Sequence, residues 1–353
     1  MNIAYIIPSI IKQGPPLVIL DLVKEMQRRG HECCVYYFDE KSGADKIDYP
    51  CPTQRIKMSD SLLWDKIDVV HTHSWRAELY MARHRNELKN TRYISTIHEF
   101  IYANLRSKHS AVFSFLFTQF HLSLLRKADC RVCLSLQHEK YYKKKFGKLP
   151  LTYIYNTKTV DYNSKLTAEE EQEILSFKEE TSNLLGLNAL LTPRKAVDVV
   201  IDALPLLKDC KLFVVGNGMS LDDLKKRAKE KGVADRVYFA GYKTDAFRYI
   251  PYYDIYMMPS RSEGFPLALL EAMAFKCNAV ISDIPIFKEF FTENEMTFFH
   301  LDDPKDCARA VKEAINNKKG DKAYIKYMEC YSPRIFGDMY EKVYKGSCNP
   351  HID

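Results

Sequence analysis

One stretch, residues 256–285, constrains the fold of this chain more than any other; it reads YMMPSRSEGFPLALLEAMAFKCNAVISDIP. An apolar strand ends at Met258 and a polar turn follows. Strong helix formers begin after Pro266, whose missing N–H costs nothing in the first turn of a helix. A second apolar run, residues 279–282, comes after the helix. This order of strand, turn, helix and strand predicts a parallel α/β unit, in which ligands bind beyond the carboxyl end of the first strand.

Two carboxylates flank the predicted helix start: Glu263 lies in the turn and Glu271 lies more than one turn inside the helix. The free N–H groups of Phe265, Leu267 and Ala268 at the helix start would attract an anion such as a diphosphate. A carboxylate is unexpected at an anion site unless it binds hydroxyl groups, which sugars supply. The alternative is a chance spacing of one acid at a helix start and one exposed helix residue.

Length and composition predict a reduced, two-domain globular protein. The chain has 353 residues, 46% of them hydrophobic, and no run approaches the roughly 20 apolar residues of a membrane span. The short apolar start predicts a first buried strand rather than a signal peptide. Ten cysteines show no framework spacing, which favours a cytosolic location. The CxxC at Cys130 and Cys133 has no second pair and is more typical of a buried strand than of zinc.

Histidines end two of the predicted strands. His71 and His73 are two residues apart and therefore point the same way. Metal ligation is one interpretation, although no third ligand is apparent; polar strand-end histidines beside a cleft are the other. His98 ends a further strand, residues 93–98.

The run PSRSEGFPLALLEAMA, residues 259–274, resembles the E-x7-E signature of the retaining glycosyltransferases of family 4, which use nucleotide-sugar donors. The resemblance implies the GT-B fold, an α/β architecture of two Rossmann-like domains facing a cleft. We expect an acceptor-binding first domain over residues 1–160, with a crossing helix at 333–353, and a donor-binding second domain over 161–332. In the family the first acid lies at the donor sugar and the second binds the ribose hydroxyls, which gives Glu263 and Glu271 their expected roles.

Other positions that match the family extend the predicted donor site. Lys195 matches the lysine that holds the donor diphosphate and Arg194 adds a second charge, the alternative being a surface basic pair. His98 matches a strand-end histidine that reaches the donor sugar, the alternative being a capping histidine. The remaining expected donor contacts are Gly14 in the first loop, Gly216, Tyr242 beside the base, and the helix start Gly264, Phe265, Pro266 and Leu267.

The chain also departs from the family pattern. Pro15 stands where a second loop glycine is usual, Thr157 and Ala196 replace glycines, Leu190 and Leu191 occupy the place of an arginine, and Lys276 and Asn278 occupy a Gly-x-Pro turn. The matched carboxylates and Lys195 are nevertheless intact.

The expected reaction is transfer of a sugar from a nucleoside diphosphate sugar, a UDP-sugar, to an acceptor hydroxyl with retention at the anomeric carbon. In the family's usual account the acceptor attacks the same face with help from the leaving phosphate. We expect no cofactor and no metal, because no Asp-x-Asp cluster stands in a suitable place. The alternatives are a sugar-nucleotide 2-epimerase-like isomerase and a non-catalytic nucleotide-sugar-binding subunit. An NAD enzyme is disfavoured by the incomplete glycine fingerprint after residue 215.

Charge and one aromatic segment suggest a membrane partner. Residues 1–165 hold 26 Lys and Arg against 16 Asp and Glu, a net +10, whereas the remainder holds 26 against 30, a net −4. Residues 106–127, RSKHSAVFSFLFTQFHLSLLRK, form either a core helix or a helix lying on a bilayer. With the lysines of residues 143–145 they predict peripheral contact with an anionic membrane at its cytoplasmic face. The expected acceptor is then a glycan or lipid-linked glycan of O-antigen, capsule or lipopolysaccharide; no nucleic acid is expected as partner.

Overall fold

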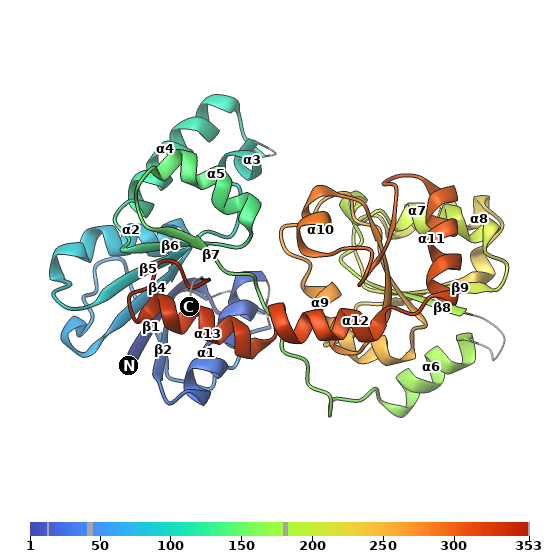
Figure 1. The fold of residues 1–353 in the computed structure, drawn as a ribbon, viewed down its shortest axis with the longest axis horizontal. Coiled ribbons are helices and arrows are strands. Elements are labelled where there is room, and N and C mark those ends of the chain that lie inside the picture. Colours follow the sequence, from blue (N-terminus) through green and yellow to red (C-terminus); the bar gives the residue numbers. More distant parts are fainter. Residues whose placement is uncertain (13, 41–44, 107, 179–182, 352–353) are drawn as a thin grey trace. The chain divides into compact units, whose positions relative to one another are not determined.

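A computed structural model of the chain describes residues 1–12, 14–40, 45–106, 108–178 and 183–351. Gln13 of the first loop and Ser107 of the aromatic segment lie outside these residues. The chain forms two compact units, Met1–Lys158 with Tyr331–Asp353 and Thr159–Cys330 (Figure 1). The boundaries expected from the sequence were 160/161 and 332/333.

The first unit is built on a parallel sheet. In the described residues it has seven strands in the order β3-β2-β1-β4-β5-β6-β7. The strands are β1 (Asn2–Ser9), β2 (Glu32–Asp39), β3 (Thr53–Arg55), β4 (Val69–His73), β5 (Arg92–Thr96), β6 (Cys130–Cys133) and β7 (Leu151–Tyr153). The CxxC therefore lies in a buried strand, as predicted. The inner strands are runs of buried Val, Ile and Tyr because helices cover the sheet.

Most helices of the first unit connect these strands, and the last one comes from the C-terminal segment of the chain. They are α1 (Gly14–Arg28), α2 (Trp75–His84), α3 (Ile101–Arg106), α4 (Ala111–Leu125), α5 (Leu136–Phe146) and α13 (Pro333–Tyr344). Helix α13 begins at the predicted residue, Pro333, and lies beside α1 (Figure 1). Its predicted end at residue 353 is wrong: the helix ends at Tyr344, and Gly346 follows at φ 121°, outside the helical conformation. Gly337 allows the close approach, since a Cβ there would lie 2.2 Å from the Glu25 side chain. Arg29, the residue after α1, joins the two helices through ion pairs of 2.7 Å with Asp338 and 2.9 Å with Glu341 of α13.

The second unit repeats this plan. Its described residues form a six-stranded parallel sheet in the order β10-β9-β8-β11-β12-β13. The strands are β8 (Asn183–Asn188), β9 (Cys210–Val215), β10 (Val237–Gly241), β11 (Ile255–Met258), β12 (Asn278–Ser282) and β13 (Thr297–Phe299). The helices are α6 (Ala168–Lys178), α7 (Val197–Ala203), α8 (Leu221–Glu230), α9 (Leu267–Ala274), α10 (Pro285–Phe290), α11 (Pro304–Asn316) and α12 (Gly320–Lys326). The stretch at 256–285 is thus β11, turn, α9 and β12, as its residue pattern predicts.

The strand order tells where each unit can bind a ligand. In both sheets the first strand is central: the next two strands are added on one side of it, and the later strands are added on the other side. In the first unit the order reverses between β1 and β4, and in the second between β8 and β11. Open parallel sheets bind ligands beyond the carboxyl ends of the strands at this switch point. The predicted fold class, two Rossmann-like α/β units, is confirmed.

Candidate active site

The second unit brings the predicted acid and the predicted cations together at its switch point. Glu263, in the turn after β11, accepts hydrogen bonds from Lys195 Nζ at 2.6 Å and from Arg194 at 3.1 Å. Ser260 Oγ donates to the same carboxylate at 2.5 Å. Only 7% of the Glu263 side chain is exposed, whereas half of the Arg194 side chain is. The cluster therefore presents one nearly buried anion with two cations at the carboxyl ends of β8 and β11.

The backbone around Lys195 holds this cluster in place. Lys195 ends a 3-10 turn, η3 (Pro193–Lys195), and Ala196 follows in the left-handed conformation at φ 50°. The N–H of Arg261 donates to the Arg194 carbonyl at 2.8 Å, so the two loops are joined. A small cavity between them is lined by Asn188, Lys195 and Ser260, among others. Two loops from different strands thus form one polar site.

The start of α9 differs in one detail from the expectation of free amides. The N–H of Leu267 donates to the Phe265 carbonyl at 3.0 Å, and that of Leu269 donates to the Pro266 carbonyl at 2.9 Å. The Leu267 amide is therefore engaged within the turn, and the prediction that it is free is wrong. Gly264 has open space where a Cβ would stand. Glu271 is half-buried on α9, so the alternative of an exposed helix residue does not describe it.

Gly216 and Tyr242 follow β9 and β10 in the same unit. A Cβ on Gly216 would lie 1.8 Å from the Ala189 carbonyl oxygen, and its φ is 144°. Glycine is therefore needed there for the loop after β8 to pass. Tyr242 is 67% exposed and free to stack on a flat ligand. Among the described residues, neither Gly216 nor Tyr242 hydrogen-bonds to the Glu263 cluster, so their place in one donor site stays a prediction.

The first unit gathers three histidines at the ends of β4 and β5. His71 is fully buried: Nδ1 lies 2.8 Å from the Tyr344 hydroxyl and Nε2 lies 2.8 Å from Thr96 Oγ1. His73 Nδ1 lies 2.8 Å from His98 Nε2. Burial lowers the pKa of His71 and of His73 well below the usual range, and burial followed by the charge of His138 lowers that of His98 to about 4. All three imidazoles are therefore neutral at pH 7.

The predicted loop glycine, Gly14, lies at the start of α1 in the same unit. Its φ is 43°, a conformation that favours glycine, and space is open where a Cβ would stand. The loop follows β1, one of the two switch-point strands. Gly14 thus has the freedom expected of a residue that lets a ligand approach the backbone.

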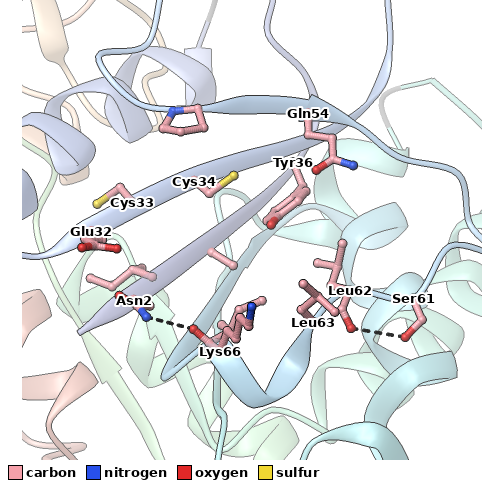
Figure 2. Close-up of a pocket in the computed structure, with 14 residues that line it drawn as sticks. Asn2, Glu32, Cys33, Cys34, Tyr36, Gln54, Ser61, Leu62, Leu63 and Lys66 are labelled. Atoms are coloured by element: carbon pink, nitrogen blue, oxygen red, sulfur yellow. Dashed lines mark hydrogen bonds between the residues drawn. The ribbon is translucent and has the colours of Figure 1, made fainter.

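A cavity of about 500 Å³ lies elsewhere in the first unit (Figure 2). Asn2 and Glu32, the first residues of β1 and β2, line it together with Tyr36 and Lys66. It therefore opens at the amino ends of the strands, the opposite edge of the sheet from His73. None of the predicted site residues lines it. Among the described residues no group of three His, Cys, Asp or Glu side chains could hold a metal ion.

Comparison with known proteins identifies the class. Residues 14–157 match the family model "Glycosyltransferase Family 4", and residues 168–329 match "Glycosyl transferases group 1". An O-antigen biosynthesis glycosyltransferase, WclY of Escherichia coli, is 28% identical over 358 residues, which cover 98% of each chain. The solved structure of Anabaena HepE in complex with UDP has a TM-score of 0.78 at 16% identity, over 98% of this chain and all of that one. A lipopolysaccharide outer core galactosyltransferase, WaaB, has a TM-score of 0.71 at 15% identity over the same shares.

The protein is therefore a glycosyltransferase of the GT-B fold. Each of its two units matches a glycosyltransferase model of its own, and the family matches and solved neighbours agree on the class. The matched proteins are transferases, which favours a transferase over the isomerase and binding-subunit alternatives.

Proposed function

We propose that this enzyme moves a sugar from a UDP-sugar to a hydroxyl of a glycan or lipid-linked glycan, with retention at the anomeric carbon, in the synthesis of O-antigen or another surface polysaccharide. The contact that carries the proposal is the Glu263–Lys195 pair at the switch point of the second unit. It puts a cation for a diphosphate next to an acid for sugar hydroxyls. The relative WclY supports the acceptor class, and the HepE complex supports UDP as the nucleotide.

The chemistry assigns each residue a task in this proposal. Departure of UDP leaves negative charge on the diphosphate, which Lys195, Arg194 and the N–H groups of Gly264 and Phe265 would stabilise without a metal ion. The sugar carbon gains positive character, and Glu263 and His98 would orient its hydroxyl groups. Glu271 would bind the ribose diol, and Gly14, Gly216 and Tyr242 would complete the donor contacts.

A donor screen tests the proposal. UDP-sugars should raise the melting temperature, and an active pair of donor and lipid-linked acceptor should give a product whose anomeric configuration, measured by NMR, equals that of the donor. Glu271→Ala should weaken UDP binding by about 1.5–3 kcal/mol, the contribution of a hydrogen bond to a charged group. Unchanged UDP affinity in calorimetry would remove Glu271 from the site, and an inverted product would refute retention.

We propose further that helix α4 rests on the cytoplasmic face of an anionic membrane. Its polar residues Ser114, Thr118 and His121 face inward and are buried. Its outward face is apolar: among the exposed large hydrophobic side chains are Val112, Phe113, Phe115, Leu116 and Phe120, between 40% and 70% exposed. A water-soluble helix normally has the reverse arrangement, whereas a helix that lies on a bilayer exposes its apolar side.

The inward polar face of α4 is satisfied, so its orientation is fixed by the fold. His121 Nε2 pairs with the buried Glu78 carboxylate of α2, and Ser95 Oγ donates to the same carboxylate at 2.8 Å. Thr118 Oγ1 donates to the Ser114 carbonyl at 2.6 Å. Turning the helix over would leave the buried Glu78 carboxylate with Ser95 but without His121, at a cost of several kcal/mol. The expectation of a core helix is therefore wrong for the outward residues, while Leu122, Leu124 and Leu125 are core.

Lysines of α5 would strengthen this contact. Lys143, Lys144 and Lys145 are exposed, and the Lys145 carbonyl accepts a bond of 3.2 Å from Arg126 at the end of α4. Each lysine adds about 1 kcal/mol near an anionic surface. No helix among the described residues is long and apolar enough to cross a membrane.

Liposome co-sedimentation tests the membrane contact. Binding should require anionic lipid, fall with added salt, and weaken when residues 143–145 are changed to Glu or when Phe115 and Leu116 are changed to Ser. Changing three exposed lysines of α8, namely Lys225, Lys226 and Lys229, to Glu makes the matched control and should have little effect. Equal recovery in the supernatant with anionic and neutral vesicles would refute the contact.

A further inference from the structure

His73 is a buried side chain with an unusual hydrogen-bond arrangement. It is 2% exposed, and Nδ1 lies 2.8 Å from His98 Nε2. Its other nitrogen, Nε2, is buried and has no hydrogen-bond partner among the described residues. The neighbouring His71, by contrast, has partners at both nitrogens. His98 is only partly buried, so it is the member of the pair that a ligand can reach.

The orphan nitrogen decides where the protons lie. Because both rings are neutral, one of the two facing nitrogens is a donor and the other an acceptor. If His98 Nε2 donated, His73 would carry its proton on the orphan Nε2, which would bury an unpaired N–H. If His73 Nδ1 donates, only a lone pair is left unpaired. A buried N–H without a partner is the rarer and costlier of the two.

We infer that His73 is a positioning residue that donates its Nδ1–H to His98 Nε2 and thereby fixes His98 as the Nδ1–H tautomer. The tautomer of an imidazole is set by the bond that its other nitrogen makes. His98 then presents a fixed N–H donor rather than a base. The next step rests on the proposed function: the His98 N–H would point to an oxygen of the sugar that is transferred, and His73 would act only through His98.

The loop that carries His98 is also fixed in position, which makes the direction of this N–H definite. The Glu99 carbonyl accepts from His138 Nε2 at 2.9 Å and from the Tyr142 hydroxyl at 3.0 Å. The Tyr142 hydroxyl in turn accepts from the Ile101 N–H at 3.0 Å. The backbone on the carboxyl side of His98 is thus held by α5, and its ring is held by His73 of β4.

Nitrogen NMR of protein labelled with ¹⁵N in its histidines tests the tautomer directly, with or without any activity. The chain has ten histidines, and comparison with the His98→Asn variant identifies the signals of His98. We expect the His98 Nδ1 to be protonated and its Nε2 to be unprotonated at pH 7.5. An Nε2–H tautomer of His98 in the parent protein would overturn the inference.

Two substitutions at His73 separate proton donation from packing. The amide nitrogen of His73→Asn can replace the Nδ1–H, so this variant should keep the His98 tautomer and keep kcat within about threefold. His73→Leu removes the donor, so His98 should shift toward the Nε2–H form that free histidine prefers, and kcat should fall at least roughly tenfold. UDP affinity should stay within about twofold in both, because the expected effect lies at the reacting sugar.

His84 provides the matched control. It is buried in the same unit, has one partner, Glu87 at 2.7 Å, and has an orphan Nε2, but it lies on α2 away from the strand ends. His84→Leu should lower stability as His73→Leu does and leave the His98 signals unchanged. Loss of kcat in His73→Asn equal to that in His73→Leu would refute the positioning role. If no sugar donor turns over at all, the proposed function fails while the NMR result still decides the tautomer.

Discussion

The Glu263→Gln substitution should weaken the fold and strengthen UDP binding at the same time. Glutamine keeps the size of the side chain and can still accept from Ser260, but it removes the charge that pairs with Lys195 at 2.6 Å. A hydrogen bond between charged partners contributes about 1.5–3 kcal/mol, and the half-exposed Arg194 adds little. We therefore expect a loss of about 2 kcal/mol in the free energy of unfolding. For a unit of this size that lowers the melting temperature by roughly 4–8 °C.

The effect on UDP has the opposite sign because the carboxylate opposes the diphosphate twice. It neutralises Lys195, and its own charge repels the ligand. Two unit charges about 4 Å apart in water interact by about 1 kcal/mol. Removing the charge should therefore tighten UDP binding by about that amount, roughly fivefold in Kd. Turnover should fall at least roughly tenfold, since the amide cannot balance positive charge on the sugar.

Calorimetry of unfolding and of UDP binding measures both effects. Asp202→Asn is the matched control: Asp202 is similarly buried in the same unit, at 10% exposed, and pairs with Arg227 at 2.7 Å. It should lower stability by a comparable amount and leave UDP affinity unchanged. Weaker UDP binding in Glu263→Gln, by fivefold or more, would refute the reasoning, because the carboxylate would then assist the diphosphate instead of competing with it.

Three further outcomes can be measured. The free energy of unfolding should fall as pH falls from 6.5 toward 4, because His98 and His138 have pKa values lowered to about 4 and the unfolded chain binds protons first. Linkage gives a loss of about 2 kcal/mol per histidine by pH 5. Chemical-denaturation midpoints that do not change over this range would contradict the prediction. Lys276 lies at φ 56°, so the free energy of unfolding should be about 1 kcal/mol higher for Lys276→Gly than for Lys276→Ala. Both variants lose the contact with Tyr324, and only glycine relieves the left-handed strain. Turnover should persist in EDTA, and its loss with recovery on adding Mg²⁺ would show that a metal carries the diphosphate charge.

The parts of the fold that depend on neighbours in sequence were predictable. The strand–turn–helix–strand order of residues 256–285 follows from apolar runs, Pro266 and helix formers, and each acts within a few residues. The parallel connection then places Glu263 at the carboxyl end of a strand. The starts of α11 and α13 were predictable for the same reason, since Pro304 and Pro333 open them.

The pairs within the candidate site were not predictable, because they join distant residues. Lys195 and Glu263 are 68 positions apart and meet only since β8 and β11 are neighbours in the sheet. The bond from His73 to His98 needs the register of β4 on β5, in which His73 lies beside Thr96. A list of strand-end histidines names the residues but not which nitrogen faces which.

In helix α4 the sequence pattern identifies the two sides of the helix correctly but predicts the wrong side to be buried. Ser114, Thr118 and His121 are spaced as one stripe of a helix, which was a readable signal. A polar stripe ordinarily faces water, and that rule would place the phenylalanines on the other side of the helix in the core. The buried Glu78 reverses it, because a charge inside the unit needs the His121 partner that only the polar stripe supplies.

The departures from the family pattern concern side chains more than backbone, which bears on whether they remove activity. Ala196 replaces a glycine yet keeps φ 50°, and Lys276 replaces another yet keeps φ 56°. A left-handed conformation costs a non-glycine residue about 1–2 kcal/mol, so the surrounding fold imposes it at both turns. Asn278, in the place of a proline, secures the next turn by accepting from the N–H groups of Lys319 at 2.6 Å and Gly320 at 3.0 Å. Since the loops keep their course, these three substitutions give no reason to expect a binding subunit without catalysis.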